Sequence, residues 1–205
     1  MSKLLKITAL CLTLLFVSEA LSKAEGPRLR YGLQWGYNAK VATSYAYTIY
    51  NSNGSRISDS QPFTGDYYTN AFVSADLGLE FLNYFAFTLK AGYRGVEEDY
   101  RVMPLELQFS IFPWSYDESG LFLFGSGGFA LYQWSLEDKI NLMSAGIGLR
   151  RNMGLKISLD GFLKANLTTC SPLPVDQFEG RIPRDRTVYS RAKHISLDLG
   201  IALYF

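Results

Sequence analysis

The residues with types and spacing suited to chemistry are few. The chain of 205 residues contains a single histidine, His194, which lies two positions before Ser196. Residues two apart in an extended strand point to the same face, so this pair could place an imidazole beside a hydroxyl, as nucleophilic hydrolysis requires. With only one histidine, a zinc site built from several histidines is excluded. No cofactor motif is found.

Charged side chains form a second candidate group, because they recur at even positions between apolar residues. Seven are basic and five are acidic. If they share a narrow interior, they must pair, since an isolated buried ion is costly. They would then form a lumen ion-pair network or, alternatively, line a narrow path for ions or small solutes. The residues are Arg30, Lys40, Asp76, Glu80, Lys90, Arg94, Glu106, Arg150, Lys156, Asp160, Lys164 and Asp198.

Two polar segments carry candidate binding residues. Residues 45–70 contain Tyr67 and Tyr68, which suit sugar or protein surfaces, and residues 168–193 are rich in arginine. Arginines bind phosphate groups well, so Arg181, Arg184 and Arg186 could contact lipopolysaccharide. The alternative is that both segments are ordinary exposed loops.

The elements that position these residues are strands. In the last twelve residues the odd positions from Ile195 to Phe205 are apolar, while the even positions are polar, small or amphipathic. This period of two predicts a strand with one apolar face. The same phase recurs in seven segments, which begin near residues 29, 73, 85, 105, 121, 143 and 155. The segment 121–134 is apolar on both faces at its start, and we assign Leu121, Leu123, Phe129 and Leu131 outward.

The contents of the two faces indicate which one lies inside. Eight strands enclose an interior only just wide enough for side chains, and Trp35, Phe87 and Phe109 with many leucines would overfill it. Glycines alternate with the charges instead, as a crowded interior requires. We therefore predict an all-β fold, a single eight-stranded antiparallel up-and-down transmembrane β-barrel with its apolar face outward.

The connections support this topology. Short turns are predicted around residues 83, 114–120 and 152, and longer polar segments at 45–70, 95–101, 135–140 and 168–193. Short turns at one end and longer loops at the other are typical of such barrels.

The first 24 residues predict export. Lys3 and Lys6 precede an uncharged apolar core over residues 7–18, and residues 22–24 read Ser-Lys-Ala. This is the pattern of a signal peptide, so we assign 1–24 to the signal peptide and 25–205 to the barrel. Cys170 would be the only cysteine left after cleavage, in a polar loop, and no intramolecular disulfide is possible. The mature chain is nearly neutral, and nothing in it indicates nucleic-acid binding.

The strand pattern with the terminal Phe205 resembles the small eight-stranded bacterial outer-membrane proteins, such as the transmembrane domains of outer-membrane proteins A and X and the porin-like barrels. The resemblance covers residues 27–205 and is specific for architecture. It implies the outer membrane of a Gram-negative bacterium, contact with outer-membrane lipid and lipopolysaccharide, and an assembly signal at Phe205 that the barrel-assembly machinery reads. It leaves the oligomeric state open.

For function, the expectation is an integral outer-membrane barrel that is not an enzyme, with a charge-paired lumen and surface loops for envelope structure or for ligand or adhesive binding. A narrow channel is the alternative. Barrel lipid A deacylases use a His-x-Ser arrangement, which His194-Ile195-Ser196 matches. However, Leu197 stands where that family usually has Asn, no acidic residue follows at the usual spacing, and both side chains point inward.

Overall fold

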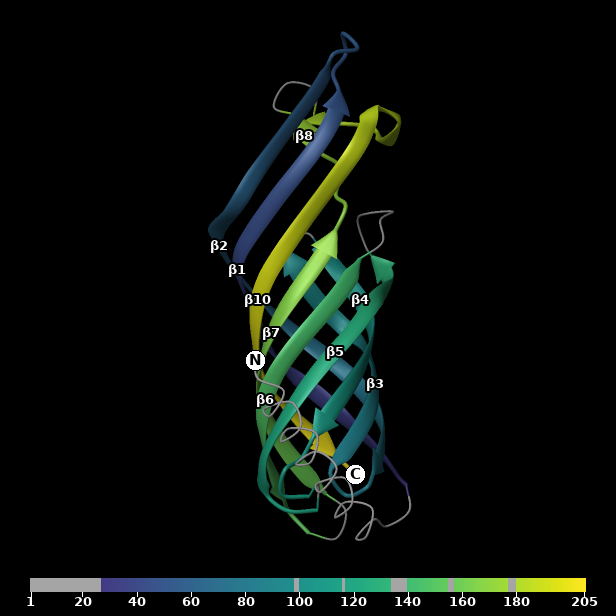
Figure 1. Ribbon diagram of the computed structural model, residues 1–205, viewed down its shortest axis with the longest axis vertical. Helices are drawn as coiled ribbons and strands as arrows, with labels where there is room; N and C mark the ends of the chain where they lie inside the picture. Colours follow the sequence, from purple (N-terminus) through teal and green to yellow (C-terminus); the bar gives the residue numbers. More distant parts are fainter. Residues whose placement is uncertain (1–26, 98–99, 116, 134–139, 155–156, 177–179) are drawn as a thin grey trace, which may run out of the picture.

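Eight strands close into an antiparallel barrel in the order β1-β10-β7-β6-β5-β4-β3-β2 (Figure 1). The structure is a computed structural model that describes residues 27–97, 100–115, 117–133, 140–154, 157–176 and 180–205. The predicted eight-stranded up-and-down barrel is confirmed. Its strands are β1 (Arg28–Tyr50), β2 (Arg56–Phe81), β3 (Phe85–Glu97), β4 (Tyr100–Ile111), β5 (Gly120–Gln133), β6 (Asn141–Asn152), β7 (Ser158–Cys170) and β10 (Thr187–Tyr204).

The predicted phase of the strands is also confirmed. In β10, Leu199 is 67% exposed on the outer surface, whereas the neighbouring Asp198 is 0% exposed in the lumen. In β5, Leu121, Leu123 and Phe129 face outward, as assigned. The barrel closes where β1 pairs with β10, with Gly36 opposite Gly200. A Cβ on either glycine would lie within 3 Å of the facing strand, so the close approach of the two strands requires glycine there.

Tight turns join the strands at the end of the barrel where the C-terminus lies (Figure 1). Between β2 and β3, Leu82 and Asn83 have φ values of 54° and 60°. Two consecutive residues with positive φ are typical of the two-residue hairpin turns that match strand twist. The connection between β4 and β5 contains Ser115, with φ of 78°.

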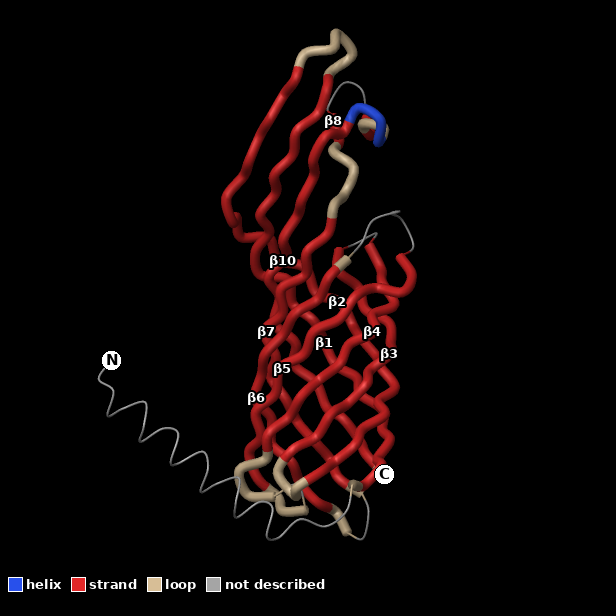
Figure 2. Tube along the Cα trace, turned by 45° about the vertical axis from the view of Figure 1, so that its right-hand side comes forward, coloured by secondary structure: helices blue, strands red, loops and turns tan. Residues whose placement is uncertain are grey.

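At the opposite end, three strands extend beyond the barrel rim, which corrects the prediction of a loop over residues 45–70. Only residues 51–55 form the turn, because β1 continues to Tyr50 and β2 begins at Arg56. Residues 45–50, 56–61 and 187–192 pair as a three-stranded sheet, here called the projecting sheet (Figures 1 and 2). Its threonine, tyrosine and isoleucine residues favour strands, and backbone pairing needs no apolar alternation.

The connection from β7 to β10 is shorter than the predicted 168–193, since β7 runs to Cys170 and β10 starts at Thr187. Between them lie a small sheet of β8 (Val175–Asp176) and β9 (Gly180–Arg181) and the 3-10 turn η1 (Arg184–Arg186). The predicted loop over 95–101 is shorter too, because β3 reaches Glu97 and β4 begins at Tyr100. None of the helical segments in the described ranges is long and apolar enough to cross a membrane.

A bulge in β1 changes the facing of the strand where the projecting sheet begins. The register with both neighbouring strands shifts between Lys40 and Ala42. Val41, an odd position that the phase of the first strand would place outward, falls at this shift and is only partly exposed. An extra residue reverses the phase, so Thr43 and Tyr45, not the even positions, continue the lumen face above it.

Candidate functional site

The outer surface of the barrel is apolar on all eight strands. Exposed fractions reach 50% at Leu77, 54% at Leu107 and 52% at Ile147. A continuous apolar surface of this kind is rare on soluble proteins. Near the tight-turn end, aromatic rings gather on this surface. The ring centroids of Phe87 and Phe109 are 5.1 Å apart, and those of the stacked Tyr31 and Phe205 are 5.9 Å apart.

The lumen holds the charged residues in layers. Nearest the tight turns, Arg150 donates two hydrogen bonds to Asp160, at 2.8 and 2.7 Å. Arg30 forms an ion pair with Glu80, and Glu80 also lies 3.4 Å from Arg150. This quartet of two arginines and two carboxylates satisfies its own charge. Such bidentate pairs are the stronger class of hydrogen bond.

Above the quartet lies a smaller group around Asp76. Tyr204 donates its hydroxyl hydrogen to Asp76 at 2.9 Å, and Ser74 does so at 2.9 Å. The ammonium of Lys90 lies 3.5 Å from the same carboxylate and also contacts Gln34. The guanidinium carbon of Arg30 lies over the ring of Tyr204, 3.7 Å from the ring centroid, so Tyr204 connects the two layers.

A third group crosses the upper lumen around Asp198. Its carboxylate contacts Arg94, lies 3.2 Å from Lys164 and accepts a hydrogen bond from Asn166 at 2.8 Å. Lys164 also lies 3.8 Å from Glu106. Eleven of the twelve predicted lumen residues are therefore brought into ion pairs, and ten of them pair within the lumen. Lys156 lies outside the described residues.

Lys40 is the exception among the eleven, because its partner lies outside the lumen set. Its ammonium lies 2.5 Å from Asp66, which is 48% exposed at the base of the projecting sheet. The hydrogen bond from Lys40 lowers the pKa of the Asp66 carboxyl. Sequence reasoning missed Asp66, since it lies in a segment that was interpreted as a loop.

Aromatic rings fill the space between the charged layers. The outward assignment of Leu121 and Leu123 already implied that Phe122 and Phe124 face inward, whereas Phe72, Phe112 and Phe162 were missed. The buried apolar cluster comprises Phe72, Ala86, Phe112, Phe122, Phe124, Phe162, Ala202 and Tyr204. Arg150 lies 4.3 Å from the ring centroid of Phe112, and Arg94 lies 5.6 Å from that of Phe72. The available signal was the even position of each phenylalanine, which places it on the face otherwise made of charged and small residues.

Little free space lies between the side chains of the upper lumen, whereas a cavity of about 780 Å³ opens at the tight-turn end, where Arg30, Glu80, Arg150 and Tyr204 line it. Two cavities in the upper lumen have volumes of about 20 and 10 Å³. Space of this size holds about one water molecule. Towards the projecting sheet, Val96, Val102, Ile140, Leu142, Cys170 and Ala192 form a second apolar cluster, against which Tyr45 packs.

The candidate pair His194 and Ser196 does not form a hydrogen bond, although both side chains are buried on the lumen face. Ser196 accepts a hydrogen bond from Asn38 at 2.8 Å. His194 instead lies 3.4 Å from the sulfur of Cys170 through Nε2 and 3.2 Å from the hydroxyl of Thr43 through Nδ1. The pairing expected of a hydrolytic site is therefore absent.

Cys170 lies at the end of β7 and is 2% exposed, which corrects its assignment to a polar loop. Its thiol and the only imidazole are buried against the second apolar cluster. In the part of the chain that the structure describes, no group of three or more potential metal ligands gathers.

The predicted binding residues are spread along the end that carries the projecting sheet. Tyr67 is 83% exposed, while Tyr68 is partly buried beside Lys40. Arg184 and Arg186 lie on η1, and the backbone of Arg181 belongs to β9. These residues come from separate elements, and no single site unites the tyrosines with the arginines.

No family model matches the chain, and no curated protein matches it in sequence. Similar solved structures include the outer membrane protein OprG from Pseudomonas aeruginosa, at a TM-score of 0.49 and 10% identity over 86% of this chain and 95% of that chain. The outer membrane protease OmpT from Escherichia coli gives 0.38 and 9% over 86% and 96%. The outer membrane protein AlkL gives 0.42 and 12% over 85% and 90%. With TM-scores below 0.5, the barrel assignment depends on the strand pairing itself.

Proposed function

We propose that this protein is an integral outer-membrane barrel of a Gram-negative bacterium, that it is not an enzyme, and that its projecting sheet and loops serve envelope structure or the binding of a surface ligand. The observation that carries the proposal is the difference in polarity between the outer face and the lumen face of the barrel. Leucine and aromatic side chains are exposed around the whole barrel, while the charged residues are buried inside it. Water outside would favour the reverse arrangement, and hydrocarbon outside favours this one.

The filled lumen supports a structural role for the barrel over transport. Each layer of charge is compensated within the lumen, and phenylalanine rings occupy the space between the layers. A channel for ions or solutes needs a continuous path, whereas the two cavities found in the upper lumen have volumes of about 20 and 10 Å³. The barrel then acts as a rigid anchor for the elements at its rim.

The projecting sheet and the adjoining part of β2 support a binding role. Exposed fractions are 42% at Tyr50, 41% at Ile57, 48% at Phe63 and 83% at Tyr67. Large apolar and aromatic side chains held on a rigid scaffold are typical of recognition surfaces. The sheet extends well past the rim formed by β3–β6 (Figure 2).

Membrane fractionation of cells that express the full chain tests the location. The mature protein should sediment with outer-membrane markers, resist extraction by carbonate, and migrate differently on gels before and after boiling, as folded barrels do. Recovery of folded protein in the soluble periplasmic fraction would contradict the proposal.

A further inference from the structure

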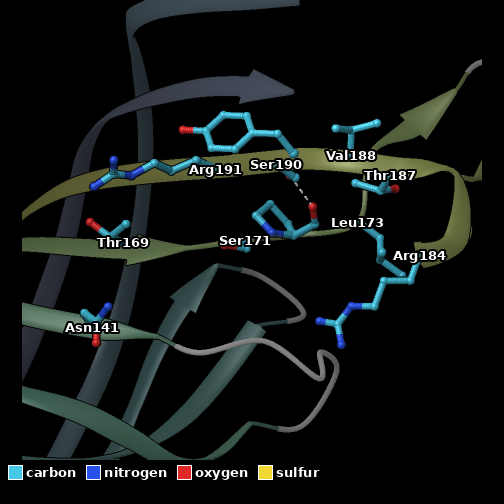
Figure 3. A pocket seen from close by; sticks show the side chains of 11 residues that line it. Asn141, Thr169, Ser171, Leu173, Arg184, Thr187, Val188, Ser190 and Arg191 are labelled. Atoms are coloured by element: carbon cyan, nitrogen blue, oxygen red, sulfur yellow. Dashed lines mark hydrogen bonds between the residues drawn. The ribbon is translucent and has the colours of Figure 1, made fainter. Parts of the chain in front are cut away.

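A pocket of about 450 Å³ lies on the outer edge of β10, where this strand leaves β7 and continues into the projecting sheet (Figure 3). β10 pairs with β7 only as far as Ala192 opposite Cys170, so the edge of residues 187–191 has no strand partner on that side. The chain after β7 folds along this edge, and the hydroxyl of Ser190 donates a hydrogen bond to the carbonyl oxygen of Pro172. A hollow is left between this segment and the rim of the barrel.

The pocket begins at the level where the outer surface changes from apolar to polar. Outward residues of the wall at one level are Met143 on β6, Leu167 on β7 and Ile195 on β10, and Met143 and Leu167 are 65% and 36% exposed. At the next outward position, Asn141 pairs with Thr169, and Thr169 pairs with Lys193. Three adjacent strands therefore leave the apolar surface together, and Asn141 and Thr169 form the floor of the pocket. In a membrane this is the depth of the lipid headgroups.

The described residues that line the pocket include two arginines and no acidic residue. Arg191 and Arg184 both line it, and Figure 3 shows Arg191 near Thr169 and Asn141, with Arg184 at the opposite end. Neither the guanidinium of Arg191 nor the ammonium of the adjacent Lys193 contacts a carboxylate of any described residue. This contrasts with the lumen, where every described cation has an acidic partner. Ser171 and Thr187 also line the pocket, and the hydroxyl of Thr187 donates a hydrogen bond to the carbonyl oxygen of Pro183.

We infer that this pocket binds the phosphate-bearing headgroup of an outer-leaflet membrane lipid. Guanidinium groups and hydroxyls suit phosphate oxygens. A lipid, rather than a soluble anion, is the favoured source because the floor of the pocket continues directly into the apolar wall. The acyl chains of a lipid held by Arg191 would lie along Leu167 and Leu197. The inference depends on the membrane location proposed above and assigns a ligand class to one surface of it.

Binding of lipid A to the folded, detergent-solubilised protein, measured by native mass spectrometry, tests the inference. The variants are the double substitution Arg184→Gln/Arg191→Gln and, as a matched control, Arg56→Gln. Arg56 is an exposed arginine at the tip of the projecting sheet, where β2 begins after the turn of residues 51–55. The ligands are diphosphorylated lipid A, its dephosphorylated form, and inorganic phosphate.

We expect the double variant to bind diphosphorylated lipid A at least about tenfold more weakly than the parent, because each charge-assisted bond to phosphate is strong. Arg56→Gln should bind like the parent, and dephosphorylated lipid A should bind the parent as weakly as the intact ligand binds the double variant. Equal binding by the double variant and the parent, or by the two lipid forms, overturns the inference. Saturable binding of inorganic phosphate at the same concentration overturns the membrane source.

A failure of the lipid site can be distinguished from a failure of the proposed membrane location. If the protein fractionates with the outer membrane but the double variant retains binding, only the lipid site fails. If the protein is recovered folded in the periplasm, the location fails and the site loses its basis. A gel mobility shift on boiling shows that each variant is folded before its binding is compared.

Discussion

The guanidinium of Arg94 on β3 contacts the carboxylate of Asp198 on β10 across the lumen, although these strands are not neighbours in the barrel. Lys164 on β7 reaches the same carboxylate at 3.2 Å. Asp198 therefore contacts two buried cations from two other strands, and Glu106, 3.8 Å from Lys164, supplies the second negative charge of this group. The side chain of Asp198 is 0% exposed, so bulk water does not reach this ion pair.

Removal of this carboxylate should be strongly destabilising. Asp198→Ala leaves Arg94 and Lys164 buried with less compensation, and breaking a buried pair in this way costs about 3–5 kcal/mol. Urea unfolding in lipid vesicles, followed by tryptophan fluorescence, measures the loss. Asp185→Ala on η1, where the carboxylate is exposed, serves as the control and should change stability little. A loss below about 1 kcal/mol for Asp198→Ala would show that the lumen pairs are not needed for stability.

Glycine positions inside and outside the barrel should respond oppositely to the same substitution. A Cβ at Gly146 would lie 2.4 Å from the carbonyl oxygen of Leu163 and 2.5 Å from the ring of Phe124, whereas none of the described atoms lies within 4 Å at Gly127. Gly146→Val should destabilise the barrel by about 1–3 kcal/mol or more through overpacking. Gly127→Val should be neutral or stabilising, because it adds a β-branched residue to the outer face. Equal effects in urea unfolding would contradict the filled lumen.

The apolar alternation was sufficient to predict the barrel strands and their facing, because the two faces of a membrane barrel differ in polarity along most of each strand. The same rule could not predict the projecting sheet. Beyond Lys40 the alternation ends, and segments such as Thr43 to Tyr50 resemble loops in sequence although they pair as strands.

The contents of the lumen were predictable in kind, while the pairings were not. The facing of Arg150, Asp160 and Glu80 follows from their even positions. Which of them meet depends on strand order and stagger, which a single sequence does not contain. Phe72 and Phe162 were missed as lumen residues because an apolar side chain among charges breaks the simple division between faces. His194 meets Cys170, not Ser196, since β7 lies beside β10 in the closed barrel.

A charge on the outer surface should prevent insertion. Leu199 is 67% exposed on β10, while Ala202 on the same strand is 1% exposed in the lumen. Leu199→Arg places a cation in hydrocarbon, which costs about 2–4 kcal/mol near the middle of such barrels. Ala202→Ser, a small polar change on the lumen face, should cost less. Folding yield into lipid vesicles measures both, and parental resistance of Leu199→Arg to heat and detergent would mean that this face does not contact lipid.

Acid should loosen the base of the projecting sheet. Hydrogen bonding from Lys40 lowers the pKa of Asp66 below its ordinary value of 3.8. The contact therefore contributes stability above that ordinary value, and the contribution is lost as the pH falls through the lower folded pKa. Because Asp66 is about half exposed, its effect should not exceed about 1 kcal/mol.

Hydrogen exchange of residues 59–69, corrected for the intrinsic pH dependence, measures this loss between pH 6 and pH 2. Protection in the parent should fall at the acidic end of this range, whereas Asp66→Asn should have lower protection throughout and no such step. Asp59→Asn, on the same strand, is the control and should keep the step. A step that persists in Asp66→Asn would assign the acid sensitivity to another group.

Single-channel recording on the refolded parent protein in a planar lipid bilayer tests the central claim most directly, because we expect a lumen filled by the Arg94 and Arg150 layers to have no continuous path. Insertion is verified in the same preparation by protease protection of the barrel. The filled lumen predicts inserted protein with no reproducible conductance steps. Reproducible conductance in the parent that disappears on neutralising Arg94 or Glu106 would contradict it and establish the narrow channel instead.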